Sequence, residues 1–259
     1  MFPKEHGAYG QLLFPLATAL AIGRPSAAAS LLAAAAIAAF LAHEPLLVIL
    51  GQRGARAARD QRARAWRWLA GMGSLAVVLG AAAVVALPAS ARTALLLPAA
   101  LAVVLGGVVS IGREHTTGGE IAAALTMASL ALPVGIASGA SAAAALTCVV
   151  AYAAAFLVAT LCVRALILVT RKLAGPSTRV VAGGVAVALV VALFALARAG
   201  ITRPIGTWAA LPICAVGVWL VAAMPSPRHL RTIGWTLVGA TTLTAIVLIV
   251  GLRIAAPQP

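Results

Sequence analysis

The side chains in this chain that could do acid–base or metal chemistry are few, and they repeat in one pattern. The sequence contains only five acidic residues and four histidines. A basic residue, Glu and His occur in order at Lys4-Glu5-His6, and again at Arg113-Glu114-His115. In each copy, Gly and then Gln or Glu follow after three more residues, at Gly10-Gln11 and Gly119-Glu120. Two copies of one pattern in so acid-poor a chain indicate a shared role.

A third acid–histidine dyad, His43-Glu44, lies inside an apolar run just before Pro45. A Glu in lipid costs a few kcal/mol unless it faces the bundle interior, is paired or is protonated. We therefore predict one site in which the glutamates are acid/base groups or metal ligands and the histidines lie beside them: Glu44, Glu5, Glu114, His43, His6 and His115. The alternative is structural, with Glu44 in an ion pair and the other dyads anchoring helix ends at the interface.

Further residues are candidates for binding a ligand at this site. Gln11 and Glu120 occupy equivalent positions where two apolar segments begin, and either could hydrogen-bond across the bundle. Four arginines could hold an anionic headgroup or diphosphate: Arg53, Arg56, Arg164 and Arg171. The Glu and His side chains would suffice for zinc or a di-iron centre, but no HExxH or ExxH spacing occurs. The metal and any other cofactor stay open.

The composition excludes a water-soluble domain. Hydrophobic residues make up 63% of the chain and charged residues 9%, and the mean hydropathy is +1.08. A soluble surface needs more polar residues than this. The net charge of +14 would suggest nucleic acid in a soluble protein. In a membrane protein its ordinary source is the cytoplasmic loops, so we expect the lipid bilayer as a partner and no nucleic acid.

A spanning helix needs about 20 mostly apolar residues. This length predicts an all-α, polytopic membrane helix bundle, a single transmembrane domain over residues 1–259. Nine spans are expected, at 8–23, 27–50, 68–87, 93–111, 119–138, 141–163, 180–199, 204–223 and 233–255.

The charges of the predicted loops give the orientation. One side receives most of the basic residues: Lys4, six arginines from Arg53 to Arg67, Arg113, four basic residues from Arg164 to Arg179, Arg228 and Arg231. The other side receives Arg24, Arg92, Arg198, Arg203 and Arg253. The richer side is cytoplasmic. We therefore predict a protein of the bacterial cytoplasmic (inner) membrane with its N-terminus inside and its C-terminus outside. All the acids and histidines fall at the cytoplasmic end.

The 109-residue offset between the two motifs predicts an internal repeat. It aligns the first span with the fifth, so the two copies share orientation and are parallel repeats. The halves would be residues 1–111 and 112–223, followed by a ninth helix.

Several motifs resemble the YwiC-like family of bacterial membrane proteins. They are Pro-Lys-Glu-His-Gly-Ala-Tyr near the N-terminus, His43-Glu44-Pro45, Gly-Gln-Arg-Gly-Ala-Arg at 51–56, the segment Arg113 to Glu120, and Pro227 to Trp235. The resemblance covers nearly the whole chain. It implies a multi-pass membrane protein and brings no established activity.

A more distant likeness is to the UbiA-type intramembrane prenyltransferases. That likeness implies nine helices in two parallel four-helix halves plus one, and prenyl diphosphate bound through Mg²⁺ by two aspartate-rich motifs. Here the first motif position has His43-Glu44 followed by arginines, and the second, Arg164 to Arg171, has no acid. Magnesium-dependent prenyl transfer is therefore not expected, and only the scaffold is carried over.

Three functions are compatible with these patterns. The first is an enzyme-like or lipid-handling protein acting on a lipid, isoprenoid or quinone-type substrate, with Arg53 and Arg164 contacting anionic groups. The second is a transporter for a small anion or metal ion, although a transport path should carry polar groups through the midplane. The third is a non-catalytic membrane subunit. Whether the protein is an enzyme stays open.

Overall fold

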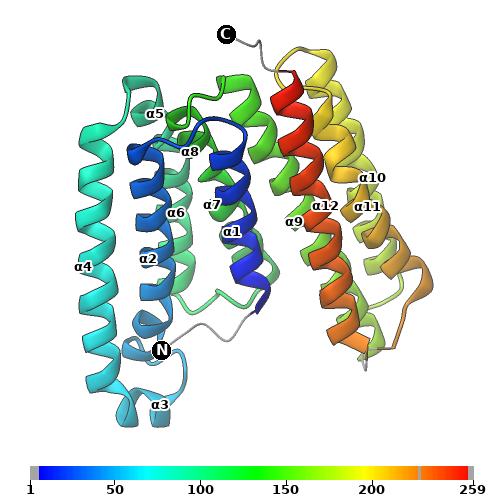
Figure 1. The fold of residues 1–259 in the computed structure, drawn as a ribbon. Coiled ribbons are helices and arrows are strands. Elements are labelled where there is room, and N and C mark those ends of the chain that lie inside the picture. The colour runs from blue at the N-terminus through cyan, green and yellow to red at the C-terminus, as the bar shows by residue number, and fades with distance from the viewer. Residues whose placement is uncertain (1–5, 227–228, 256–259) are drawn as a thin grey trace.

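The computed structural model describes residues 6–226 and 229–255, and it confirms the predicted all-α fold (Figure 1). The helices are α1 (His6–Ala21), α2 (Ala27–Ile49), α3 (Ala55–Asp60), α4 (Arg62–Ala86), α5 (Ala89–Ala94), α6 (Leu96–Ser110), α7 (Thr117–Ser129), α8 (Ala131–Ala137), α9 (Ala142–Thr170), α10 (Ser177–Arg198), α11 (Ile205–Ala223) and α12 (Leu230–Ile254). No strand occurs within the described ranges.

Short polar side chains cap several of these helices at their N-termini. The hydroxyl oxygen of Ser26 accepts a hydrogen bond from the Ala29 amide in α2, and Ser141 does the same for Ala144 in α9. A cap satisfies one of the amides that have no partner in the first turn. Single residues separate α5 from α6 and α7 from α8, so each pair forms one longer, slightly broken rod.

Eight of the predicted spans are long and apolar enough to cross a membrane. The chain is therefore a multi-pass membrane protein. The remaining predicted span corresponds to α1, which has 16 described residues and contains Pro15. The count of nine spans accordingly stays a prediction. Two helices extend well beyond their predicted limits, since α4 begins at Arg62 within the arginine-rich segment and α9 continues to Thr170.

Small residues let the helices pack closely. The alanine-rich α2 packs along α4, and α9 lies between α7 and α8 on one side and α10 and α11 on the other (Figure 1). At Gly217 a Cβ would meet Val158 Cγ1 at 2.5 Å, so only glycine allows this approach of α11 to α9. In contrast, α4 turns most of its side chains outward, as expected for a helix that faces lipid.

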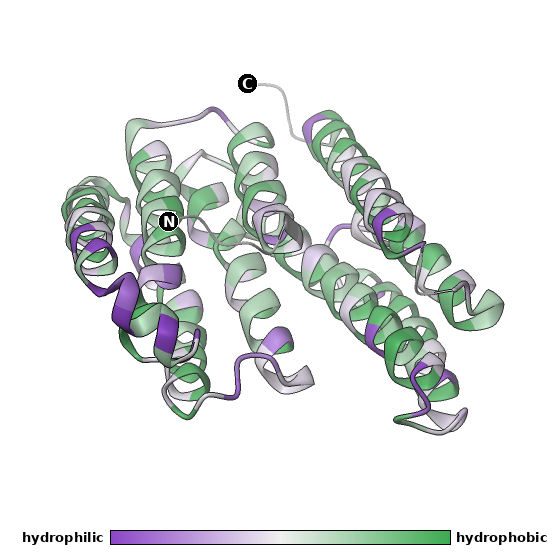
Figure 2. Ribbon diagram, turned by 90° about the horizontal axis from the view of Figure 1, so that it is seen from below, coloured by the Kyte–Doolittle hydropathy of each residue, from purple (hydrophilic) through white to green (hydrophobic). Residues whose placement is uncertain are grey.

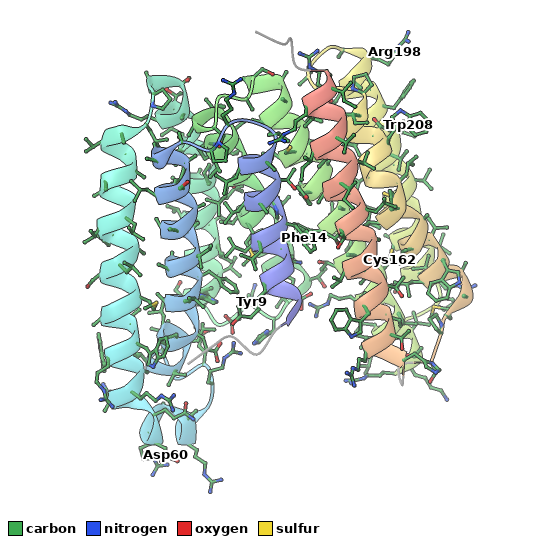
Figure 3. The ribbon with its side chains drawn as sticks, in the orientation of Figure 1. Tyr9, Phe14, Asp60, Cys162, Arg198 and Trp208 are labelled. Atoms are coloured by element: carbon green, nitrogen blue, oxygen red, sulfur yellow. The ribbon has the colours of Figure 1, made fainter. Side chains whose placement is uncertain are left out.

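The helices run up and down, so the chain's polar loops gather at two opposite ends. Asp60, in α3, lies at one end and Arg198, at the close of α10, at the other (Figure 3). The view along the bundle shows the hydrophilic residues of α3 and of the neighbouring loops at the first of these ends (Figure 2). The predicted site residues that the structure describes lie at this same end.

Candidate functional site

The site begins at the end of α2 with a buried carboxylate. Glu44 is 8% exposed, and among the described residues no other charged residue is buried. Pro45 follows inside the helix and leaves a backbone carbonyl one turn earlier without its helical donor. The chain then turns at Gly51 and Gly54, whose φ angles of 77° and 92° suit glycine. This turn brings Arg53 against Glu44 in a bidentate ion pair, with Nε–Oε1 at 3.0 Å and Nη2–Oε2 at 2.6 Å.

A second element of the site is the loop between α6 and α7. The Thr116 side chain caps α7 by accepting a hydrogen bond from the Gly119 amide at 3.2 Å, and it donates one to the Arg113 carbonyl at 2.7 Å. At Gly119 a Cβ would collide with the carbonyl oxygens of Arg113 and Glu114, the latter at 2.5 Å. The loop therefore folds directly onto the first turn of α7. This packing fixes the position from which Glu114 and His115 extend.

The two dyads meet around the Arg53 guanidinium. His115 Nε2 lies 3.0 Å from Glu114 Oε1 and 3.1 Å from Arg53 Nη1. His43 Nε2 lies 3.6 Å from Glu114 Oε2, and Arg53 Nη1 lies 3.7 Å from Glu114 Oε1. The Glu114 side chain is 11% exposed and that of His115 is 60% exposed. The cluster thus extends from the solvent into the protein interior.

Arg164 joins α9 to this cluster. Both of its terminal nitrogens donate to the His115 carbonyl at 3.1 Å, and Nη1 lies 2.8 Å from Glu120 Oε1. Glu120 lies in the first turn of α7, where a negative charge also favours the helix dipole. Arg164 therefore ties α9 to the first turn of α7 and to the loop before it.

A cavity of about 700 Å³ opens beside these residues. Its polar end is formed by His43, Glu44, Arg53, Glu114, His115 and Glu120. Its remaining wall is mostly apolar, including Ala36, Ala39, Phe40, Leu95, Pro98, Ala99, Ala102, Leu105, Met127 and Leu130, and its uncharged polar members are Gln11, Thr126 and Thr160. The lining residues of α5–α6 run from Leu95 to Val109, which corresponds to about 21 Å along a helix. The cavity is therefore long, and its ionisable side chains lie at one end.

The other candidate residues divide into two groups. Gln11 lines the cavity together with Gly7 and Ala8, so the start of α1 forms part of its wall. Glu5 and the side chain of His6 lie outside the described residues. Arg56 and Arg171 are exposed, and neither lines the cavity. The two glycines of the repeated motif differ in their surroundings, since a Cβ at Gly10 would meet Phe14 at an ordinary 3.7 Å, whereas one at Gly119 would collide with backbone oxygens.

Two supporting residues were not predicted. Gln52 donates a hydrogen bond from Nε2 to the Val109 carbonyl, and so ties the loop after α2 to the end of α6. No motif marks it. For Thr116 the sequence does indicate a role, since a hydroxyl residue just before a helix with an acid in its first turn is typical of an N-cap. The capping-box spacing from Thr117 to Glu120 would have placed the cap one residue late.

The donor set of the cluster suits hydrogen bonding and proton exchange. Over residues 6–226 and 229–255 there is no group of three or more His, Cys, Asp or Glu side chains placed to hold a metal ion. Both Glu44 oxygens are already bonded to Arg53. Carboxylate and imidazole groups in contact with one another can pass a proton between solvent and a bound molecule.

Comparison with known proteins identifies a family for the chain. The family model described as YwiC-like protein matches residues 2–135, which is more than half of the sequence. The match includes both Glu-His motifs and His43-Glu44, but it ends before Arg164. No curated protein and no solved structure matches the chain.

Proposed function

The chain belongs to the YwiC-like family, and we propose that it binds and handles an isoprenoid or quinone-type lipid at a cytoplasm-facing Glu/His/Arg site. The observation that carries this proposal is the long cavity, which is apolar along most of its length and ends at the cluster around Arg53 and Glu114. A ligand with one long apolar chain and one small polar headgroup has the matching shape.

The polar cluster supplies most of the selectivity in this proposal. Lipid tails are as apolar as the cavity wall, so moving a ligand's chain from the bilayer into the protein gains little hydrophobic free energy. Shape and the headgroup contacts then distinguish the ligand from bulk lipid. The carboxylates and histidines that line the polar end are the side chains used for acid–base chemistry on a bound substrate.

The cytoplasmic location of the site rests on the loop charges. The arginine-rich segment from Arg53 to Arg67 lies at the same end of the bundle as Glu44 and Glu114. Loops rich in arginine stay in the cytoplasm. We therefore place this end, and with it the N-terminus, on the inner side of the bacterial cytoplasmic membrane.

A transporter of a small anion or metal ion is the second candidate. Such a path needs polar or ionisable groups through the middle of the membrane. Away from the charged cluster the cavity wall is formed mainly by apolar residues such as Ala99, Ala102 and Met127, and its polar members, Thr126 and Thr160, are not ionisable. This apolar wall favours lipid binding over ion transport.

Filling the apolar part of the cavity tests the proposal. We expect the unmodified protein, purified from membranes, to carry an isoprenoid or quinone lipid enriched over the bulk extract, as measured by mass spectrometry. Ala102→Trp should remove this lipid, because Ala102 lines the cavity. Ala100→Trp is the matched control, since Ala100 is exposed on the same helix and outside the lining. Equal lipid content in all three proteins, or no enrichment in any, would refute the proposal.

A further inference from the structure

The charges at the polar end of the cavity restrict the kind of headgroup that fits there. Three carboxylates line it, those of Glu44, Glu114 and Glu120. The Arg53 guanidinium is bound bidentately to Glu44, and Arg164 is bound to Glu120 at 2.8 Å. Two arginines thus face three carboxylates among the described side chains, and each arginine already has a carboxylate partner.

Glu114 is the carboxylate whose hydrogen bonding is incomplete. Its Oε1 atom is buried, and no described group donates a hydrogen bond to it, although His115 Nε2 lies 3.0 Å away and Arg53 Nη1 lies 3.7 Å away. A buried acceptor normally has a donor, and leaving it without one costs stability. Because Glu114 lines the cavity, a bound molecule can supply that donor.

We propose that the lipid bound in this cavity has an uncharged headgroup bearing a hydroxyl, which donates a hydrogen bond to Glu114 Oε1. Prenyl alcohols and quinols share this chemistry. The inference rests on the proposed function and narrows its substrate class. A phosphate or diphosphate would bring further negative charge beside Glu114 and would have to displace Glu44 or Glu120 from its arginine.

The test compares headgroups on one apolar chain. Geranylgeraniol, its methyl ether and geranylgeranyl diphosphate share a tail and differ only in the headgroup. We expect the alcohol to bind the purified protein about 10-fold or more tightly than either of the others, because a hydrogen bond to a charged group contributes this much. The measurement is displacement of a fluorescent lipid in detergent, with Mg²⁺ and with EDTA. A short-chain quinol, measured alongside, distinguishes the two sources of the hydroxyl.

A variant identifies the acceptor. In Glu114→Gln a neutral amide oxygen replaces the charged acceptor, so binding of the alcohol should weaken about 10-fold, because a hydrogen bond to a charged group is the stronger one. Binding of the ether, which donates no hydrogen bond, should stay unchanged. Asp60→Asn is the control, since Asp60 is exposed and does not line the cavity. The headgroup comparison on the unmodified protein keeps the test valid if Glu114→Gln does not fold.

The outcomes separate this inference from the proposed function. Diphosphate binding as tight as that of the alcohol, with or without Mg²⁺, or equal binding of alcohol and ether, would overturn the hydroxyl assignment and leave lipid binding intact. No measurable binding of any probe, together with unchanged lipid content in Ala102→Trp, would overturn both.

Discussion

Arg53 connects the two acid–histidine pairs of the site. It is bound to Glu44 through two hydrogen bonds, and one of its nitrogens also lies 3.1 Å from His115 and 3.7 Å from Glu114. Its side chain is 25% exposed, whereas those of the two glutamates are 11% exposed. A cation held between one buried and one largely buried carboxylate compensates charges that would otherwise be costly to remove from water.

Removing this cation should therefore destabilise the protein. We expect Arg53→Ala to lower the free energy of unfolding by about 2–4 kcal/mol, because it leaves Glu44 buried without its partner. Arg56→Ala is the matched control, since Arg56 is exposed, and it should change the free energy by no more than about 0.5 kcal/mol. Thermal unfolding in detergent measures both.

A double variant separates the ion pair from other effects of the substitution. Glu44→Gln in the Arg53→Ala background should recover part of the lost stability, because it removes the uncompensated charge. If Arg53→Ala and Arg56→Ala prove equally stable, the ion pair between Arg53 and Glu44 contributes nothing to the fold.

At the scale of the elements, the loop before α7 can pack as it does only because residue 119 is a glycine. The carbonyl oxygens of Arg113 and Glu114 occupy the space where a Cβ of Gly119 would lie. These are backbone atoms, so they cannot move aside as a flexible side chain could. The position of Glu114 at the cavity thus depends on Gly119, which has neither a charged nor a polar side chain.

A methyl group at this position should displace the loop. We expect Gly119→Ala to destabilise the protein by about 1–3 kcal/mol, as overpacking does, and to weaken any ligand binding that depends on Glu114. Gly118→Ala is the control one residue earlier, where the nearest atom to a new Cβ is 4.0 Å away. There the helical preference of alanine should leave stability unchanged or slightly raised. Equal melting temperatures for the two variants would contradict the close packing.

The helices could largely be predicted from the sequence, and the loops that complete the site could not. Runs of about 20 apolar residues indicate spans regardless of how they pack. The partners of Glu44 and Glu114 depend instead on how two turns fold back, at Gly51–Gly54 and at residues 113–116. The repeated motif predicted Glu114 as a site residue, because Arg113-Glu114-His115 matches the pattern of Lys4-Glu5-His6. It gave no sign of Gln52, whose hydrogen bond to the Val109 carbonyl depends on how the loop after α2 lies against the end of α6.

At the scale of the whole molecule, polarity is distributed unevenly between the two ends. The Glu/His/Arg cluster, the arginines of α3 and the start of α4 lie at one end, while Arg24, Arg92, Arg198 and Arg203 lie toward the other. The two predicted halves also differ in packing. In the second, α9 and α11 are in direct contact, whereas α2 and α6, their counterparts, both line the cavity. The division at residue 111 stays a prediction.

This uneven distribution leads to a prediction about topology that also tests the crossing by α1. With the native cysteines replaced by alanine, we expect a membrane-impermeant maleimide to label Arg198→Cys and Pro25→Cys in intact cells, and Asp60→Cys only after permeabilisation. The reason is that loops rich in arginine remain in the cytoplasm, and Asp60 follows Arg53, Arg56 and Arg59. Asp60, Arg198 and Pro25 are all exposed, so each position is open to the reagent.

The accessibility of an epitope tag placed before Met1 shows whether α1 crosses the membrane. If α1 crosses the membrane, the tag is cytoplasmic while Pro25 is outside, because the two flank a single span. A tag accessible from outside, together with external Pro25, would mean that α1 does not cross and that the chain has eight spans. Labelling of Asp60→Cys in intact cells would reverse the orientation and place the Glu/His/Arg cluster on the outer face, where the proposed cytoplasmic lipid site could not operate.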